Sequence, residues 1–204
     1  MALERELRKT DLDSDPFVQF QRWFDDAVEH GELQPDAMAV ATATAGGRPS
    51  ARMVLLRGVD DRGFAFYTNY ESRKGRELDA NAFAAVTFHW PAVLRQVRVT
   101  GRVERVASDE SDRYWLARPR ESRLSAWASE QSEVIGDRDE LEARVDELHH
   151  RFSGGEVPRP TWWGGYRVVP DEIEFWQHRE DRLHDRMRYT RNGSGAWRVA
   201  RLQP

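Results

Sequence analysis

Short apolar segments separated by turn residues constrain the fold more than any other feature of this chain. Residues 37–45, 50–59 and 64–69 are rich in apolar or β-branched side chains, and glycine-containing turns at 46–47 and 60–63 separate them. Runs of this length bounded by Gly and Asp are typical of strands joined by tight turns. This part of the chain therefore predicts an antiparallel meander.

The rest of the chain alternates between helix and strand signals. Asp15 followed by Pro16 fits an N-cap and the first position of a helix that Gly31 ends, and Ser72 fits a second N-cap. Further helices are expected from Ser72 to about Ala80, from Ser108 onward, and over 137–152; strands are expected at 83–90, 95–106, 164–169 and 173–177, before a hairpin with Asn192-Gly-Ser-Gly195 as its turn. Short strands with helices between them favour a closed or half-closed antiparallel barrel with peripheral helices. No Gly-x-Gly-x-x-Gly suggests a Rossmann unit.

Length and composition set limits on the class of protein. The 204 residues suit one domain over 15–204, with a charged and flexible segment over 1–14. The net charge of -4 argues against a nucleic-acid binder. There is no cysteine, no apolar run of membrane-spanning length and no apolar core of a signal peptide near the start. A cytoplasmic protein that binds neither membrane nor nucleic acid is expected.

Several groups of phosphate-suited residues stand out in this net-acidic chain. Ser72-Arg73-Lys74 opens a predicted helix, where free N–H groups and the helix dipole already favour an anion. Tyr114, Arg118 and Ser122 recur every four residues, although Pro119 predicts a helix-to-turn transition near Arg118. Arg52 and Arg57 flank a predicted strand and would face opposite sides of it, so this segment alone favours arginines that reach water.

The stretch from Trp176 to Arg186 is the most unusual. If it is extended, Arg182, His184 and Arg186 lie on one face, while Leu183 lies on the other. Because unpaired buried charge is costly, such a row on an enclosed face indicates an anionic or electron-rich ligand. Gln96, Gln131 and Ser132 are ambiguous when taken alone. No histidine has the spacing of a metal ligand, so no metal site is expected.

Taken together, these segments resemble the pyridoxamine 5'-phosphate oxidase family over nearly the whole chain, from about Asp11 to Pro204. The motifs that carry the resemblance are R-M-V-L-L-R (52–57), F-Y-T-N (66–69), S-R-K-G (72–75), R-Q-V (95–97), R-P-R-E-S (118–122), A-S-E-Q-S (128–132), W-G-G-Y-R (163–167), and E-F-W-Q followed by R-L-H-D-R. Each motif is weak singly, but all of them in order with compatible spacing are specific.

The resemblance implies a mainly β fold, an antiparallel, Greek-key-like split β-barrel that forms a homodimer with FMN at the subunit interface. The residues that it implies for the flavin are Arg52, Met53, Val54, Leu55, Leu56, Arg57, Tyr67, Thr68, Arg73, Lys74, Gln96, Gln131, Ser132, Trp176 and Arg186. Those implied for the substrate are Arg57, Tyr114, Arg118 and Ser122 at its phosphate, and Arg182, Leu183 and His184 at its pyridine ring, with Arg182 and His184 as the catalytic pair.

The implied reaction is hydride transfer from the substrate C4' carbon to flavin N5, with reoxidation of the flavin by O2. Pyridoxamine 5'-phosphate would give pyridoxal 5'-phosphate, ammonia and H2O2, and pyridoxine 5'-phosphate would give the aldehyde directly. The sequence departs from the family where Arg57 replaces a common lysine, Gln34 a common acid and His178 a common glycine. The stretch before Asp11 lacks an Arg-x-x-Tyr, so the resemblance implies a reduced or different lid.

Two other functions remain open at this stage. A related flavin oxidase of phenazine biosynthesis would keep the flavin residues without needing the phosphate set Tyr114, Arg118 and Ser122, whose presence favours the vitamin B6 substrate. A non-catalytic flavin- or pyridoxal-phosphate-binding protein would bind cofactor without turnover, because a fold alone does not fix function.

Overall fold

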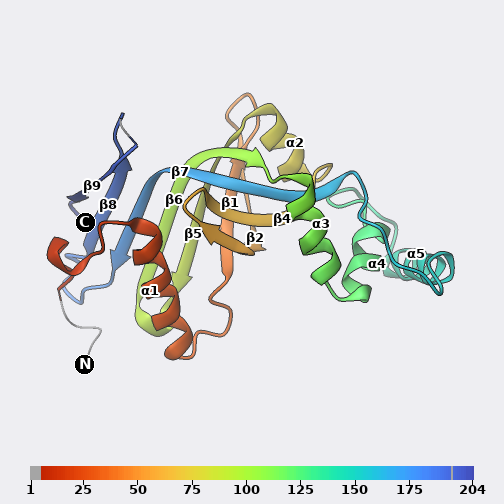
Figure 1. The fold of residues 1–204 in the computed structure, drawn as a ribbon, viewed down its shortest axis with the longest axis horizontal. Helices are drawn as coiled ribbons and strands as arrows, with labels where there is room; N and C mark the ends of the chain where they lie inside the picture. Colours follow the sequence, from red (N-terminus) through yellow and green to blue (C-terminus); the bar gives the residue numbers. More distant parts are fainter. Residues whose placement is uncertain (1–5, 194) are drawn as a thin grey trace.

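An antiparallel sheet that curls into a half-barrel forms the body of the molecule (Figure 1). The computed structural model describes residues 6–193 and 195–204, and within them nine strands form this one sheet. The strands are β1 (Ala37–Ala43), β2 (Pro49–Leu55), β3 (Gly58–Asp60), β4 (Gly63–Asn69), β5 (Phe83–Trp90), β6 (Arg95–Arg105), β7 (Trp163–Gln177), β8 (Asp185–Arg191) and β9 (Trp197–Arg201). The helices are η1 (Lys9–Asp11), α1 (Pro16–Glu29), α2 (Arg73–Ala80), η2 (Pro91–Val93), α3 (Ser108–Ala117), α4 (Arg120–Ala128) and α5 (Arg138–Arg151). The predicted barrel with peripheral helices is confirmed.

The sheet branches at β7, its longest strand. The main path runs β2-β1-β5-β6-β7-β4-β3, while β8 and β9 continue from β7 away from this path. Along one edge of β7, residues 163–168 pair with β4 and residues 172–177 pair with β8. The first half of β7 therefore belongs to the barrel wall that carries β3 and β4, and the second half belongs to the C-terminal hairpin.

The sequence predicted two strands, at 164–169 and 173–177, where the structure has one. A β-bulge allows β7 to run through Pro170: Gly101 of β6 lies opposite Pro170, Thr100 lies opposite Glu172, and Asp171 is the extra residue. A Cβ at Gly101 would lie 2.0 Å from the carbonyl oxygen of Val169, so only glycine fits at this position. The prediction of two separate strands was wrong. Proline has no N–H to donate to a neighbouring strand, and the bulge allows the strand to continue through it.

Helix α1 closes one side of the barrel. Asp15 caps it as predicted, with its carboxylate accepting from the Phe17 N–H at 2.8 Å. Phe20 is fully buried and contacts Phe64 and Phe88, each with ring centroids 5.0 Å apart. Aromatic contacts of this kind, together with the alternating buried side chains of the strands, make up the main core.

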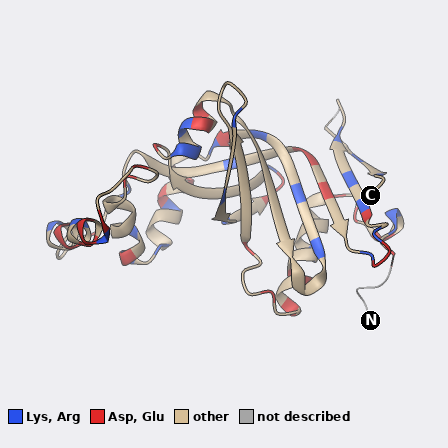
Figure 2. Cartoon of the chain, turned by 180° about the vertical axis from the view of Figure 1, so that it is seen from behind, with Lys and Arg blue, Asp and Glu red and all other residues tan. Residues whose placement is uncertain are grey.

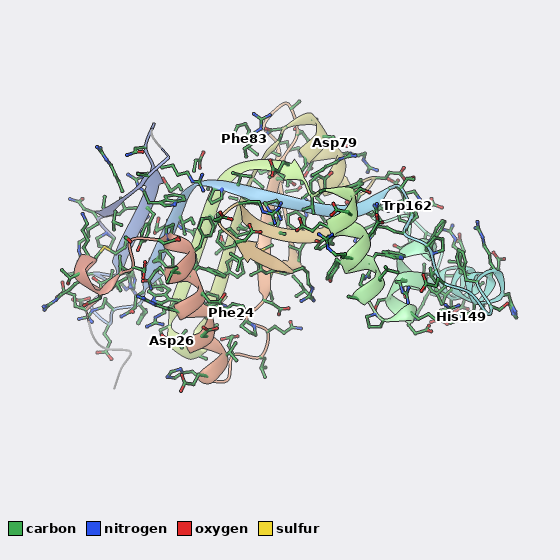
Figure 3. The ribbon with its side chains drawn as sticks, in the orientation of Figure 1. Phe24, Asp26, Asp79, Phe83, His149 and Trp162 are labelled. Atoms are coloured by element: carbon green, nitrogen blue, oxygen red, sulfur yellow. The ribbon has the colours of Figure 1, made fainter. Side chains whose placement is uncertain are left out.

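Helices α3, α4 and α5 form a lobe at one end of the molecule, and the β8–β9 hairpin lies at the opposite end (Figure 1). A second, smaller core under the lobe contains Trp115, Leu124, Val157 and Trp163. His149 on α5 lies far from Phe24 and Asp26 on α1 (Figure 3). The two ends are therefore separated by the length of the barrel.

The segment at 6–14 lies against the C-terminal hairpin. The Leu7 N–H donates to the Asp185 carboxylate at 3.0 Å, and Arg201 donates to the Leu7 carbonyl at 2.6 Å. The predicted flexibility of 1–14 remains a prediction, since its first five residues lie outside the described part and packing does not measure motion. In that described part, no helix has the length and apolar character needed to cross a membrane.

The region between Trp176 and Arg186 is not one extended segment. Strand β7 ends at Gln177, β8 begins at Asp185, and a loop joins them in which Arg182 has a φ of 63°. The alternation that the sequence suggested for Arg182 and His184 was therefore wrong, because a left-handed residue interrupts it. Of the predicted site residues in this region, only Trp176 and Arg186 lie in strands, where they pair directly across β7 and β8.

Candidate functional site

A cavity of about 990 Å³ opens between the edge strand β2, strand β4, the start of α2 and the helices α3 and α4. This volume is at the upper end of the range of small-molecule sites, and so it suits more than one small ligand. Its lining residues are Ser50, Ala51, Arg52, Met53, Val54, Leu55, Arg57, Tyr67, Thr68, Asn69, Arg73, Lys74, Tyr114, Arg118, Pro119, Glu121, Ser122, Ser125, Ala126, Ser129, Gln131, Ser132 and Trp163.

The N-terminus of α2 points its backbone toward this cavity. Ser72 caps the helix, as predicted, by accepting from the Gly75 N–H at 3.3 Å. A Cβ at Gly75 would lie 1.9 Å from the Tyr70 carbonyl oxygen, so glycine lets the helix begin against the end of β4. The Arg73 N–H donates to the Ser132 hydroxyl at 3.2 Å. A helix N-terminus with a hydroxyl bound to it is suited to an anionic ligand.

Lys74 is buried beside this helix start. Its ammonium group donates to Thr68 at 2.9 Å, to Ser72 at 3.1 Å and to the Gln131 side-chain carbonyl at 2.9 Å. None of these partners is charged. Burial, and secondarily the charge of Arg52, lower the pKa of Lys74 to about 8. A buried ammonium group without a carboxylate partner favours an anion in the cavity.

Glu77, one helical turn after Arg73, connects three elements of the cavity wall. Its side chain is only 6% exposed and accepts from the Ser50 hydroxyl at 2.5 Å, from the Thr42 hydroxyl, and from Arg73 Nε at 2.9 Å. Arg52 Nη2 lies 3.4 Å from the same carboxylate. Burial raises the pKa of Glu77, but the hydrogen bonds from Ser50, Thr42 and Arg73 outweigh it and bring this pKa to about 2. Glu77 is therefore ionised and tied to both arginines.

A second group of polar side chains lies where α3 ends and α4 begins. Arg118 is the C-cap residue of α3, which confirms the predicted helix-to-turn transition. Its guanidinium lies over the ring of Trp163 at 4.7 Å, and its Nη1 is buried without a hydrogen-bond partner among the described residues. Burial lowers the pKa of Arg118. Because buried donors in proteins are almost always satisfied, this nitrogen indicates a missing acceptor.

Aromatic rings form the wall between the two polar groups. The rings of Tyr67 and Tyr114 stack with centroids 4.0 Å apart, and Trp163 stacks on Tyr67 at 5.8 Å. Burial, and then the nearby charge of Glu110, raise the pKa of Tyr67 to about 12, so its phenol stays protonated. A wall of stacked rings is suited to a flat, aromatic ligand.

Most of the remaining predicted residues lie elsewhere, on the outer face of the sheet or in the loop between β7 and β8. Gln96, Trp176 and Arg186 form one row across β6, β7 and β8. We call these three residues, together with Arg182 and His184 of the loop between β7 and β8, the C-terminal group. The His184 ring lies 4.6 Å from the ring of Trp176, and its Nδ1 accepts from the Arg179 N–H at 3.0 Å.

A second buried glutamate supports this group. Glu174 accepts from Arg186 Nε at 2.8 Å and also from Arg98. Burial raises the pKa of Glu174, but the hydrogen bonds from Arg186 and Arg98 hold it below its usual value. Figure 2 shows such acidic and basic positions side by side on the strands near the C-terminus. Arg186 is thus held in place by an ion pair.

The cavity and the C-terminal group are too far apart to meet over one small ligand within a single chain. Trp163 of the cavity is the first residue of β7, and Trp176 is its penultimate residue. An extended strand of that length separates them by up to about 40 Å. Figure 1 shows the two ends of β7 on opposite sides of the barrel.

The cavity unites most of the residues singled out in the sequence. Both Arg52 and Arg57 line it, although alternation placed them on opposite sides, because β2 ends at Leu55 and Arg57 lies in the turn that follows. Leu56 packs in the core and does not line the cavity. The predicted residues outside the cavity are Leu56, Gln96, Trp176, Arg182, Leu183, His184 and Arg186.

Some functional residues were missed. Ser125 and Ser129 follow Ser122 on one face of the helical lobe and line the cavity. Their spacing of three and four residues is the signal that could have placed them beside Ser122. Glu77 follows Arg73 by four residues, the spacing of a helical ion pair. Both signals were present in the sequence, but nothing in it distinguishes them from ordinary surface pairs.

Family models match two parts of the chain. Residues 24–152 match the family described as pyridoxamine 5'-phosphate oxidase, and residues 163–204 match the pyridoxine 5'-phosphate oxidase C-terminal dimerisation region. The second match covers β7, β8, β9 and the loop between β7 and β8, and it therefore includes all of the C-terminal group except Gln96. The chain therefore includes a region of the kind through which members of this family dimerise.

Curated relatives and solved structures agree with these matches. The chain is 56% identical to the pyridoxine/pyridoxamine 5'-phosphate oxidase of Rubrobacter xylanophilus over 208 residues, covering 100% of this chain and 95% of that protein. It is 54% identical to the enzyme of the same name from Cupriavidus pinatubonensis over 198 residues, covering 97% and 93% of the two chains. The chain belongs to the pyridoxamine 5'-phosphate oxidase family.

Among solved structures, PhzG from Burkholderia lata 383, in complex with tetrahydrophenazine-1-carboxylic acid, superposes with a TM-score of 0.92 at 36% identity, covering 99% of this chain and 100% of that one. A pyridoxamine 5'-phosphate oxidase-related, FMN-binding protein from Nostoc punctiforme superposes with a TM-score of 0.72 at 17% identity, covering 91% and 97%. The second likeness shows the shared split-barrel fold.

Proposed function

We propose that this member of the family is an FMN-dependent oxidase that converts pyridoxamine 5'-phosphate and pyridoxine 5'-phosphate to pyridoxal 5'-phosphate, with O2 as electron acceptor. One observation carries the proposal: a single cavity contains two separate groups of phosphate-suited side chains. We call Arg52, Arg73 and Lys74 the flavin group, and Arg57, Tyr114, Arg118 and Ser122 the substrate group. Two groups in one cavity suit two phosphorylated ligands.

The flavin group would hold the FMN phosphate. It combines the N-terminus of α2, the buried Lys74 without a charged partner, and two arginines fixed by Glu77. These donors fit a phosphate dianion, which accepts several charge-assisted hydrogen bonds at once. When bound, FMN supplies the redox chemistry: it accepts a hydride and passes the electrons to O2. Thr68 and Gln131, already bonded to each other at 3.0 Å, would complete this part of the site.

The substrate group would hold the phosphate of the pyridine ester. The buried Arg118 Nη1 lacks an acceptor within the described chain, and the ester phosphate would provide one. Arg57 reaches the cavity while Asp36 holds its Nη1 at 2.6 Å. The Tyr67–Tyr114 stack would keep water away from the ligands between the two phosphates.

We further propose that the C-terminal group of one subunit completes the cavity of its partner in a homodimer, so that FMN lies at the subunit interface. This group is built around a fixed arginine but does not line the cavity of its own chain described above. Apart from Gln96, it also lies within the residues that match a dimerisation region. In a twofold dimer the exchange would be reciprocal and would give two equal sites.

Within the C-terminal group, Arg182 and His184 would orient the pyridine ring. Because His184 Nδ1 accepts from the Arg179 N–H, the proton of the neutral imidazole is assigned to Nε2. Nε2 can therefore donate a hydrogen bond to an oxygen on the substrate ring. Arg182 is exposed in its loop, so its side chain is free to reach a ligand that is bound in the cavity of the partner subunit. Fixed orientation of the reacting carbon is the contribution expected of these residues.

The test is formation of pyridoxal 5'-phosphate from pyridoxamine 5'-phosphate in air by purified protein supplied with FMN. The aldehyde product with an equal amount of H2O2 supports the oxidase. Bound FMN without product from either ester would leave a flavin oxidase of another substrate or a non-catalytic binding protein. The cytoplasm is the proposed location, because charged phosphate esters do not cross membranes unaided; cell fractionation tests this.

A second candidate is an oxidase of phenazine precursors. The 36% identity and the close superposition with PhzG favour it as the main alternative. The substrate group argues for the phosphate esters, since an unphosphorylated tricyclic acid would not need Arg118, Tyr114 and Ser122 together. Comparing turnover of the phosphate esters with turnover of tetrahydrophenazine-1-carboxylic acid decides between the two.

A further inference from the structure

The Glu77 carboxylate is buried behind the flavin group and is bonded to both of its arginines. We propose that Glu77 is a positioning residue, whose carboxylate holds Arg52 and Arg73 in the orientation that receives the flavin phosphate. This inference rests on the proposed function of the cavity and adds to it a residue that does not itself line the cavity.

The contacts of Arg73 show how the positioning works. Glu77 accepts from Arg73 Nε at 2.9 Å, while Nη1 and Nη2 have no hydrogen-bond partner within the described residues. Arg73 lines the cavity, and about half of its side chain is exposed there, 53%. The carboxylate therefore fixes the inner edge of the guanidinium and leaves its outer nitrogens for two oxygens of one phosphate.

Arg52 is fixed on the opposite side of the same carboxylate. Its Nη1 donates to the Thr42 hydroxyl at 2.6 Å and to the Val40 carbonyl at 3.2 Å, and its Nη2 donates to Ser50. The hydroxyls of Thr42 and Ser50 in turn donate to Glu77. One carboxylate thus ties strands β1 and β2 to helix α2, and the distance between the two arginines depends on it.

Glu77 also carries a negative charge, which could oppose phosphate binding. Two hydroxyls and two guanidiniums compensate this charge locally, and the flavin group with Glu77 still contains three cations for one carboxylate. We therefore expect orientation to outweigh repulsion. The two effects predict opposite results when the charge is removed, so an experiment can separate them.

The experiment compares binding of FMN with binding of riboflavin, which lacks the phosphate, by quenching of flavin fluorescence. In the wild-type protein we expect a clear preference for FMN. Glu77→Gln should reduce this preference by roughly tenfold, since charge-assisted hydrogen bonds would be lost at the phosphate. Riboflavin affinity and kcat at saturating FMN should not change. A residue that only supported the fold would alter both flavins equally.

Two further variants accompany Glu77→Gln: the first is a matched control, and the second is an independent test. Glu110→Gln removes a glutamate that also pairs with a buried arginine, Arg167 at 2.8 Å, but outside the cavity, and it should keep the wild-type preference. Thr42→Val removes one hydroxyl that donates to Glu77 without changing charge, and it should lower the preference by about threefold. If Glu77→Gln does not fold, Thr42→Val decides the matter.

The outcomes are distinguishable. An unchanged or increased FMN preference in Glu77→Gln, or an unchanged preference in Thr42→Val when that variant has to decide, overturns the positioning role. A wild-type protein that binds both flavins equally overturns the proposed phosphate site instead, and with it the proposed function of this end of the cavity.

Discussion

The flavin group and the C-terminal group contain the same arrangement in different surroundings. In each, a glutamate that is almost fully buried binds two arginines: Glu77 binds Arg52 and Arg73, and Glu174 binds Arg98 and Arg186. The first arrangement lies behind a concave cavity next to a helix N-terminus. The second lies on the open face of a sheet.

The difference indicates what each arrangement can do alone. A concave site with a helix N-terminus and an ammonium group whose hydrogen-bond acceptors are neutral can bind a phosphate within one chain. The Arg186–Glu174 pair lies outside the cavity, so it does not enclose a ligand by itself. We expect this ion pair to hold Arg186 in the orientation that the cavity of the partner subunit requires. The two regions therefore represent the two halves of one proposed site.

The largest effect is expected at the C-terminal group. Replacing both Arg182 and His184 by Ala should lower kcat by about 100-fold, because the pyridine ring would lose its orientation. FMN affinity should change little, since the flavin group is intact. Steady-state kinetics with pyridoxamine 5'-phosphate and a flavin titration measure the two quantities. Unchanged turnover with bound flavin would refute the role of this pair.

A smaller effect is expected in the cavity. Arg118→Ala should raise the KM for pyridoxamine 5'-phosphate by about 30-fold, the loss typical of a charge-assisted contact, and should leave kcat near that of the wild type. Steady-state kinetics over a range of substrate concentrations measures both constants. Arg113→Ala is the matched control, because Arg113 pairs with Asp109 on the same helix but outside the cavity. A similar KM in Arg118→Ala and in this control would contradict the substrate-phosphate assignment.

Mixing these variants tests whether the two regions serve one site across a dimer. The Arg118→Ala chain keeps its C-terminal group, and the Arg182→Ala, His184→Ala chain keeps its cavity. Heterodimers would contain one intact site of two, so an equal mixture after subunit exchange should regain about a quarter of wild-type activity at low substrate concentration. Each variant exchanged with itself is the control. No recovery would mean that each chain completes its own site.

The elements that local chemistry determines could be predicted from the sequence. Asp15 and Ser72 cap their helices as expected, because the bond from a side chain to a nearby N–H depends only on neighbouring residues. The strand at 83–90 was predicted with the bounds that the structure shows, since its alternation is regular. These features do not depend on the rest of the fold.

Features that depend on distant residues could not be predicted in the same way. Strand β7 runs through Pro170 because a β-bulge forms there. The bulge needs Gly101, far away in the sequence, since a larger residue would clash with the Val169 carbonyl. The left-handed Arg182 interrupts the expected row because the chain must turn from β7 into β8. Similarly, spacing cannot show that Arg52 and Arg57 meet in one cavity. The family motifs contain most of the residues that line the cavity. They do not show that the predicted site residues lie in two places, the cavity and the C-terminal group.

A further effect, small near pH 8, distinguishes the two regions by pH. Burial, and then Arg52, lower the pKa of Lys74 from 10.5 to about 8 in the flavin group, whereas the hydrogen bond from Arg186 to Glu174 raises the pKa of Arg186 in the C-terminal group. The second pKa of the flavin phosphate is about 6, so the phosphate is a dianion above pH 7. Of these two side chains, only Lys74 should therefore change charge between pH 7 and pH 10, a range in which flavin binding can be titrated.

The sign follows from proton linkage. Above pH 8 the free protein has lost the Lys74 proton, while a bound phosphate favours the protonated amine, so FMN binding must take up a proton. The affinity for FMN should fall by up to about tenfold for each pH unit above 8. Without ligand, the folded state releases this proton before the unfolded state does, so this group makes stability rise as the pH increases from 8 toward 10.5.

Lys74→Met tests the assignment, because it removes the titrating group while keeping a chain of similar length. Its FMN affinity should be lower at pH 7 and should lose the decline above pH 8, and riboflavin binding should show no such decline in either protein. The same slope in the wild type and in the variant would assign the titration to another group. The buried ammonium group would then be a structural part of the wall, and phosphate binding would rest on the two arginines and the N-terminus of α2.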